Sequence, residues 1–570
     1  MTQQSLILAA QSNGRLDVNF LDYSILAFYF AIVVAIGVLA RRAITTSEDF
    51  LLSGRSLPAW VTGIAFISAN LGAIEILGMA ANGAQYGIST VHFYWIGAVP
   101  AMVFLGVVMM PFYYGSGVHS VPEYLRRRYN SATHQFNAWT FAASAVLQAG
   151  VNLFAMALII RSLLGWPIGL SIFLAAGFVL LYITLGGLSG AIYNEVLQFF
   201  VILAGLIPVV IVGLHAVGGW DGLKTKIEAS QPNGAALFSQ WGGTAVGHPT
   251  NPLGDWIGIV MGLGFVLSFG YWTTNFAEVQ RALAAKDLSA GQRTPLIGAY
   301  PKIFIPALTI IPGLLALVLI PKIGQPDGDA TYNDAIPRLM GLLLPNGVLG
   351  VALAGLLAAF MAGMAANVSS FNTVFTYDIW RAKFAPGRPD AYYLRMGRYI
   401  TIAGILISVL TAFIASGYSN IQNYLQLLFS IFNAPLFATF IIGMLWKRTT
   451  AWAGFWGLLS GTVAAGIGHF ALTGLNIGSW DIWSPWVTIE STQSQNFYGA
   501  IIAFVVDAVV TVAVTMFTQP KPESELAGLV AGVPNPNAAP KVTNLPWYES
   551  PKLLGGGALL ITLILSLIFL

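Results

Sequence analysis

Two polar side chains, Asn70 and Glu75, lie in the middle of the apolar segment FISANLGAIEILGMAANGAQYG, which covers residues 66–87. Moving a carboxylate out of water is costly, so an acid inside a membrane almost always faces a cavity or a partner rather than lipid. We therefore expect Glu75 to point inward, where it can hold a polar solute or a cation. The alternative is a protonated acid that ties two helices together.

The composition places this segment in a membrane protein. Of the 570 residues, 56% are hydrophobic and 9% are charged, whereas about 25% of the residues in a soluble domain are charged. The sequence therefore predicts an all-α polytopic protein embedded in a lipid bilayer. The chain has 26 Lys+Arg, 23 Asp+Glu and no long basic run, so we predict no nucleic-acid partner.

Other classes of function are also excluded. The sequence has no cysteine, which rules out disulfides and thiolate metal sites. The apolar segments carry no metal-binding cluster and no nucleophile–base pair, so we do not expect an enzyme. Residues 1–19 lack the basic start of a secretory signal, and we expect no cleaved signal peptide. The connections between spans are too short to bury a core of their own, and they indicate no obligatory protein partner.

The hydrophobic segments divide the chain into membrane spans. About 20 apolar residues are needed to cross the hydrocarbon of a bilayer, and this length predicts fourteen spans. They are placed at 20–40, 58–84, 90–113, 136–160, 165–185, 189–215, 254–277, 299–321, 346–377, 399–416, 421–445, 451–473, 497–518 and 553–570.

The Lys and Arg residues outside the spans predict the orientation. With the N-terminus outside, nineteen of them fall on the inner side and six on the outer side, and Lys302 stays within a span. Inner loops are enriched in Lys and Arg. We therefore predict a multi-pass protein of the inner (cytoplasmic) membrane with both termini outside.

The order of the spans predicts an internal repeat. After the first span, five helices are followed by five more, and an odd number means that the second set runs with inverted topology. Each set opens with a helix interrupted by small and polar residues, SANLGAIE at 68–75 and GLGFVLSFGYWTTN at 262–275. Such a pair is typical of a transporter site at the bilayer midplane, although the glycines could serve helix packing alone. The predicted units are an N-terminal part with an extra span (1–57), a first repeat (58–219), an outer loop (220–253), a second repeat (254–446) and peripheral C-terminal helices (447–570).

Six segments of the sequence carry a family resemblance. They are SANLGAIEILGMAANGA (68–84), SVPEYLRRRY (120–129), GGLSGAIYNEVLQ (186–198), YWTTNFAEVQRALAAK (271–286), FNTVFTYDIW (371–380) and GMLWKRTTAWAGFWGLLSG (443–461). Together they resemble the sodium/solute symporter family, particularly its sodium/glucose and sodium/galactose branch, in order and topology over roughly residues 20 to 520. The resemblance implies the LeuT-type five-plus-five inverted repeat and secondary active transport.

The resemblance also implies a solute pocket. In sugar-carrying relatives a Gln or His occupies the position of Glu75, a lysine that binds sugar occupies that of Lys302, and a glutamine that bonds sugar occupies that of Gln426. Tyr271 matches an aromatic lid on the inner side of the sugar. Lys302 offers a counter-charge to Glu75 unless it extends to the inner interface. The full set implied to contact solute is Glu75, Met79, Phe93, Tyr94, Ser268, Tyr271, Lys302 and Gln426.

Several positions depart from the family's pocket. A Tyr-Glu pair of the family reads Phe93-Tyr94 here, a serine reads Gly97, and an asparagine reads Ser268. Sugar therefore stays the leading substrate, ahead of an inositol-like polyol and then of an amino acid or other amine that would pair with Glu75.

The coupling ion, Na⁺, is implied to bind between the interrupted first helix and the eighth core helix. Relatives place two adjacent hydroxyls where this chain has Ala362 and Gly363, and neither side chain offers the hard oxygen that Na⁺ prefers. Ser68 and Asn367 could supply oxygens instead, or an acid such as Glu75 or Glu195 could carry H⁺. The set implied for the ion is Ser68, Leu71, Ala359, Ala362, Gly363, Asn367 and, on its inward release path, Glu195.

The sequence thus predicts a symporter that imports a small polar solute, foremost a sugar, with Na⁺ by alternating access. A proton-coupled carrier, an uncoupled carrier and a solute sensor are the alternatives.

Overall fold

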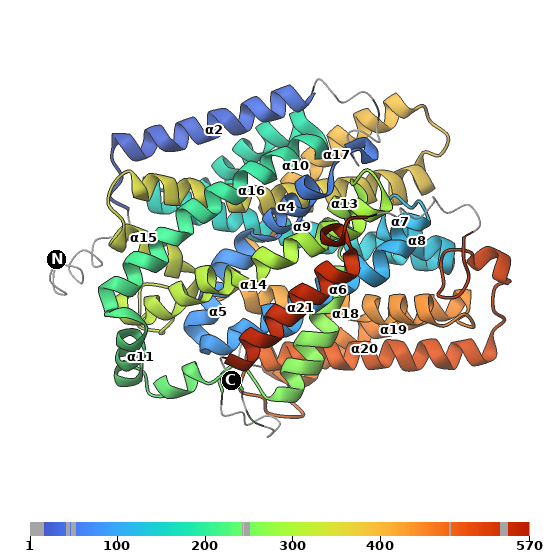
Figure 1. Ribbon diagram of the computed structural model, residues 1–570. Helices are drawn as coiled ribbons and strands as arrows, with labels where there is room; N and C mark the ends of the chain where they lie inside the picture. Colours follow the sequence, from blue (N-terminus) through green and yellow to red (C-terminus); the bar gives the residue numbers. More distant parts are fainter. Residues whose placement is uncertain are drawn as a thin grey trace.

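The computed structural model describes residues 16–41, 46, 53–241, 243, 251–477, 480–535 and 545–568. Long helices lie side by side through the molecule, with α2 along one edge and α19 and α20 along the opposite edge (Figure 1). The start of the predicted N-terminal unit lies outside the described residues. So do residues 42–45 and 536–544, which contain Arg42 and Lys541, two of the basic residues used to predict the orientation.

The first half of the chain contains the helices up to residue 238. They are α2 (Phe20–Arg41), η1 (Ser53–Arg55), α4 (Ala59–Asn70), η2 (Ile74–Gly78), α5 (Met79–Tyr86), η3 (Gly87–Val91), η4 (Phe93–Ala98), α6 (Val99–Phe104), η5 (Leu105–Met109), α7 (Met110–Gly115), α8 (Val121–Arg128), α9 (Ser131–Leu164), α10 (Ile168–Val217), α11 (Gly219–Ser230) and η6 (Gly234–Phe238).

The second half is also mostly helical. Its elements are η7 (Gly258–Ser268), α12 (Phe269–Thr274), α13 (Phe276–Leu283), α14 (Leu288–Leu319), η8 (Tyr332–Asp334), α15 (Ala335–Leu343), α16 (Val348–Val374), η9 (Phe375–Phe384), α17 (Asp390–Ala415), α18 (Ile421–Leu445), α19 (Ala451–Thr473), β1 (Leu475–Ile477), β2 (Trp480–Trp483), α20 (Thr492–Phe517), η10 (Glu523–Leu526), η11 (Trp547–Glu549) and α21 (Pro551–Ile568).

Capping residues in the sequence explain several helix ends. Asn130 and Asp287 accept hydrogen bonds from the first turns of α9 and α14, because side-chain oxygens satisfy the free N–H groups there. Gly165 ends α9 in the left-handed conformation, at φ 70°, which a glycine adopts without strain.

Eleven helices in the described residues are long and apolar enough to cross a membrane, or thirteen if two bent pairs each count as one span. These thirteen correspond to thirteen of the fourteen predicted spans. The spans expected at 165–185 and 189–215 lie in one continuous helix, α10, whose first part includes the apolar segment Ile168–Leu180.

The fold is all-α, as predicted. The connection after α19 contains a short antiparallel pair of strands, β1 and β2. The connection predicted at 220–253 begins within the helix α11. Both features connect long helices, and both lie outside the segments predicted as repeats, 58–219 and 254–446.

Both helices that the sequence marks as interrupted are broken. The chain bends by 53° between α4 and the segment that begins at Ile74, and by 49° between α12 and α13. The first break contains Gly72, where an added Cβ would lie 3.1 Å from the Cα of Gly363 on α16. Glu75 follows in the π-helical turn η2, a conformation that is frequent at functional sites.

The N-terminal helix α2 is anchored on α16 through Asp22. The fully buried Asp22 carboxylate accepts hydrogen bonds from the backbone N–H groups of Gly347 and Gly350 at 2.7 and 2.8 Å, and from Asn346 Nδ2 at 2.7 Å. Gly347, the N-cap residue of α16, has no side chain that could accept these hydrogen bonds. Asp22 therefore caps the first turn of α16 in its place.

Replacing Asp22 with alanine is expected to lower the free energy of unfolding by about 1.5–3 kcal/mol, because buried N–H groups lose a charged acceptor. Thermal unfolding of the detergent-purified protein measures this effect. The exposed Asp17 provides the control, since its Asp17→Ala variant keeps the backbone carbonyl that Asn346 contacts. Equal melting temperatures for the two variants would contradict the anchoring role of Asp22.

Candidate functional site

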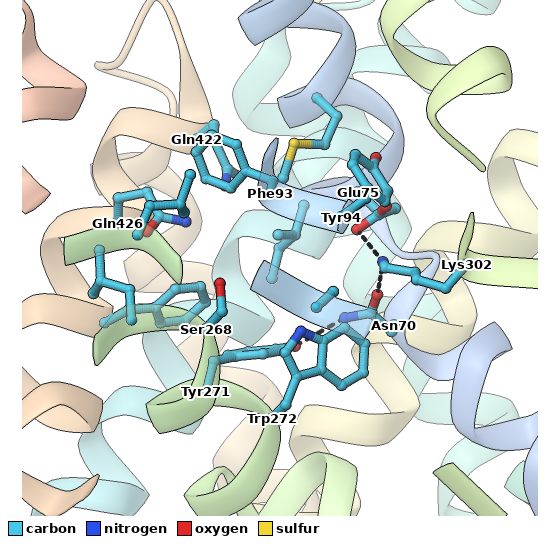
Figure 2. Close-up of a pocket in the computed structure, with 16 residues that line it drawn as sticks. Asn70, Glu75, Phe93, Tyr94, Ser268, Tyr271, Trp272, Lys302, Gln422 and Gln426 are labelled. Carbon is cyan, nitrogen blue, oxygen red and sulfur yellow. Dashed lines mark hydrogen bonds and ion pairs between the residues drawn. The ribbon is translucent and has the colours of Figure 1, made fainter. Parts of the chain in front are cut away.

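A cavity lies where the two broken helices meet α14 and α18. Its lining residues are Asn70, Ile74, Glu75, Met79, Phe93, Tyr94, Ala98, Leu263, Leu267, Ser268, Tyr271, Trp272, Lys302, Gln422, Gln426 and Phe429. All eight residues that the resemblance implied for solute contact are in this set. Figure 2 shows Gln422 and Gln426 on one side of the cavity, with Lys302, Asn70 and Glu75 opposite.

Lys302 and Glu75 form a buried ion pair in the cavity wall. Lys302 Nζ lies 2.8 Å from Glu75 Oε2, and both side chains are at most 4% exposed. The ammonium also donates to Asn70 Oδ1 at 2.5 Å and lies 4.9 and 5.1 Å from the ring centroids of Tyr94 and Trp272. Lys302 therefore does not extend to the interface, and the expected counter-charge for Glu75 is present.

A chain of hydrogen bonds leads from this ion pair to the base of the cavity. Asn70 Nδ2 donates to the Tyr271 hydroxyl at 3.2 Å, and that hydroxyl donates to Glu278 Oε1 at 2.7 Å. The Tyr271 ring packs against Phe429 with their centroids 4.7 Å apart. Tyr271 is thus fixed both by its ring and by its hydroxyl.

The opposite wall offers buried acceptors. Gln422 Oε1 and Gln426 Oε1 have no hydrogen-bond partner within the described residues, and neither does Glu75 Oε1. All three side chains are less than 5% exposed. Unsatisfied buried acceptors are unfavourable, so the cavity suits a solute with several hydrogen-bond donors.

Two departures from the family's pocket pattern are sterically linked. An added Cβ on Gly97 would overlap Ser268 Oγ and lie 3.0 Å from Ser268 Cβ. A glycine at residue 97 therefore makes the room that the Ser268 side chain occupies.

The break in the first helix is filled by Asn152 of α9. Asn152 Oδ1 accepts the backbone N–H of Ala73 at 2.9 Å, and Asn152 Nδ2 donates to Gln148 O at 3.2 Å. An added Cβ on Gly363 would overlap Asn152 Oδ1 and lie 2.9 Å from its Cγ. The Asn152 oxygen therefore lies where a side chain on Gly363 would begin.

Two residues implied for the ion site have other contacts. Asn367 Nδ2 donates to Gly363 O, one turn back on its own helix, at 3.0 Å. Glu195 is fully buried in an ion pair, with Arg281 Nη2 2.5 Å from Oε1 and Nε 3.3 Å from Oε2. Both oxygens of Glu195 thus contact the arginine.

The remaining groups between α4 and α16 offer oxygens to a cation. Ser68 Oγ is buried without a hydrogen-bond partner among the described residues, and Asn152 Oδ1 has a second lone pair beyond its bond to Ala73. Leu71, Ala359 and Ala362 are also buried, and their apolar side chains leave only backbone carbonyls as ligands. This donor set fits Na⁺, which prefers hard oxygen ligands.

The sequence matches a family model, the sodium:solute symporter family, over residues 50–461. The chain belongs to this family of symporters. The sodium/glucose cotransporter of Vibrio parahaemolyticus is 28% identical over 461 residues, which cover 77% of this chain and 83% of that protein. Sodium/glucose cotransporter 4 of Homo sapiens is 28% identical over 587 residues, covering 96% and 84%.

Solved structures show which fold the symporter has. A Na⁺-coupled sialic acid symporter in a substrate-bound outward-open state matches with a TM-score of 0.72 at 18% identity, over 88% of this chain and 99% of that chain. Mhp1, a nucleobase-cation-symport-1 family transporter in a closed conformation, matches with a TM-score of 0.51 at 13% identity, over 84% and 97%. The fold is LeuT-type, and the predictions of the family and of a transporter rather than an enzyme are confirmed.

Sequence reasoning missed several residues around the symporter's cavity. Trp272, Gln422 and Phe429 line it, each within one turn or one residue of a predicted contact. Helical spacing from Gln426 could have found Gln422, since residues four apart lie on the same face. Asn152 had no comparable signal, because its helix is otherwise a long apolar span.

Proposed function

We propose that this symporter imports a small neutral polyol, foremost a hexose sugar, together with Na⁺ by alternating access. The proposal is supported mainly by the cavity, which combines three unsatisfied buried acceptors with aromatic rings and the Glu75–Lys302 pair. Sugar hydroxyls donate to such acceptors, and a ring can cover the apolar face of a pyranose. Similarity to the sodium/glucose cotransporters supports the same substrate class.

The ion pair favours a neutral solute over an amine. Lys302 already pairs with Glu75, so an ammonium group on the solute would have to displace Lys302 from its buried partner. A hydroxyl can instead donate to Glu75 Oε1 and leave the pair intact. We also assign the two inverted repeats to 58–219 and 254–446, in the cytoplasmic membrane with both termini outside.

For the ion, we propose a site in which Ser68 Oγ and Asn152 Oδ1 replace the hydroxyls missing from Ala362 and Gly363. Backbone carbonyls of Leu71 and Ala359 complete the set. Glu195 is not part of it, because both of its oxygens contact Arg281.

Uptake into proteoliposomes tests the proposed function. D-glucose, D-galactose, myo-inositol and L-alanine are each supplied as labelled solutes, with either an inward Na⁺ gradient or K⁺ in its place. We expect the Na⁺ gradient to accumulate a hexose above equilibrium. Entry that only reaches equilibrium, with or without Na⁺, would identify an uncoupled carrier, and no entry of any solute would reject the proposal.

Replacing Gln426 with alanine is expected to weaken solute binding about five- to hundredfold, because loss of a hydrogen bond to a buried polar group costs about 1–3 kcal/mol. The concentration dependence of uptake measures this effect. Gln495, whose amide donates to Ile489 O outside the cavity, gives the control variant Gln495→Ala. Unchanged affinity in Gln426→Ala would remove Gln426 from the pocket.

Replacing Asn152 with alanine is expected to lower the apparent Na⁺ affinity about five- to hundredfold, because the cation loses an oxygen and the Ala73 N–H loses its acceptor. Gly363→Ser should act in the same direction, since its Cβ would displace the Asn152 amide. The Na⁺ dependence of uptake is the measurement. Thr140→Ala on the same helix is the control, because the Thr140 hydroxyl bonds only to carbonyls of its own helix. Wild-type Na⁺ affinity in Asn152→Ala would exclude this ligand.

A further inference from the structure

Glu278 is a buried acid that the proposed solute and Na⁺ sites do not use. It lies in the first turn of α13 and is 2% exposed. Its Oε1 accepts from the Tyr271 hydroxyl, whereas Oε2 has no hydrogen-bond partner within the part of the chain that the structure describes. A buried carboxylate with a free oxygen is unfavourable, and a proton neutralises it.

The cations near Glu278 have other partners. Arg281, one turn further along α13, donates to both oxygens of Glu195 and to Ala277 O. Lys302 donates to Glu75 and Asn70. Glu75 and Glu195 therefore each have a cation within 4 Å, whereas Glu278 forms no ion pair among the described residues.

The helices packed around α13 determine what Glu278 faces. The bonded neighbour on α12 is Tyr271, and α4 contributes the neutral Asn70. On α16, Ser369 and Thr373 bond to Gln280 of α13. These and the other surrounding elements carry several titratable groups among the described side chains: Tyr271 on α12, Arg293, Tyr300 and Lys302 on α14, Tyr193, Glu195 and His215 on α10, Tyr113 and Tyr114 on α7, Arg281 on α13 itself, and Glu75 beyond Lys302.

Glu278 is connected to the solute cavity. The hydrogen bonds run from Glu278 to the Tyr271 hydroxyl, on to Asn70, and through Lys302 to Glu75. The part from Tyr271 to Glu75 is drawn in Figure 2. A change of charge on Glu278 therefore alters the hydrogen bond that fixes Tyr271 at the base of the cavity.

We propose that Glu278 binds a proton that this symporter carries with its solute, and that Tyr271 links the proton site to the cavity. The ionised carboxylate holds the Tyr271 hydroxyl strongly. Protonation at Oε2 removes the charge and weakens that bond, so the tyrosine can move from the base of the cavity. The proton enters from water on one side and leaves to water on the other, and no other bond is made or broken. The proton site follows from the burial of Glu278 and its unpartnered Oε2. The coupling of this proton to solute rests on the proposed function.

Infrared titration tests the proton site without any solute. The purified protein in liposomes is titrated between about pH 5 and about pH 9, where buried carboxyl groups titrate. We expect one component of the protonated-carboxyl C=O band to disappear as the pH rises, to be missing in Glu278→Gln, and to be present but shifted in Glu278→Asp, while the component from the buried Asp507 remains in every variant. The variant Glu228→Gln, at an exposed acid beside Lys224, should keep the band. A titrating band that is unchanged in Glu278→Gln, or no titrating band in the wild type, would overturn the proposal.

A pH-sensitive dye trapped in proteoliposomes tests the coupling. D-glucose, D-galactose or myo-inositol is added outside, and we expect the solute that enters to acidify the lumen in the wild type. In Glu278→Gln, proton entry should fall at least tenfold while exchange of labelled solute across the membrane persists. Solute entry without proton entry in the wild type would overturn the coupling. If no solute enters, the proposed function fails, and the infrared titration still decides whether Glu278 binds a proton.

Discussion

Replacing Lys302 with methionine is expected to abolish uptake and lower the stability of the symporter by about 3–5 kcal/mol, because Glu75 then stays buried without a cation. Glu75→Gln should have a smaller effect on stability, since the Lys302 ammonium keeps Asn70 and two aromatic rings. The double variant should be more stable than Lys302→Met, because a buried ion pair removed as a whole is often close to neutral for folding. Melting temperatures of the purified single and double variants measure the coupling.

The exposed pair of Lys322 and Asp327 gives a control, since both side chains are more than half exposed. Lys322→Met should change stability by less than about 1 kcal/mol. If Lys302→Met and the double variant melt at the same temperature, Glu75 and Lys302 are not energetically coupled. Glu75→Gln also separates substrate classes, because a sugar carrier should keep its transport whereas an amine carrier should lose solute binding.

Replacing Arg281 with methionine is expected to lower the stability of the symporter by about 3–5 kcal/mol, as much as Lys302→Met, because Glu195 then remains fully buried without its partner. Arg281 also joins α13, which follows the break in the second interrupted helix, to α10. We therefore expect the Arg281→Met protein to lose uptake as well as stability, and the double variant with Glu195→Gln to recover much of the stability.

Melting temperatures and uptake of these variants should be compared with those of Arg293→Met. Arg293 pairs with Glu549 at 2.9 Å, but 34% of the Glu549 side chain is exposed, so water screens this pair and its loss should matter less. An Arg281→Met protein that melts like Arg293→Met would show that the buried pair does not stabilise the joint between α10 and α13.

The sequence predicted the parts of this protein that the membrane constrains most strongly. Few charged residues are tolerated in the hydrocarbon, so Glu75 and Lys302 were visible as candidate functional residues among apolar neighbours. The small and polar residues around Asn70 and Asn275 likewise marked the two breaks, because helices in a membrane are interrupted mainly where the chain lines a site. The eight implied pocket residues followed from the family resemblance, and they line one cavity.

The tertiary structure decided which polar groups face one another. Side chains three or four residues apart share a helix face, but the partner across the interface depends on how whole helices pack, which no local pattern records. Asn152 therefore fills the position beside Gly363, and Asn367 turns back to its own helix. For the same reason Arg281 pairs with Glu195 and leaves Glu278 without a cation among the described residues. Charged residues are rare in the membrane because burying them is costly, so the sequence shows which residues are candidates for function. Which residues they contact depends on how the helices pack.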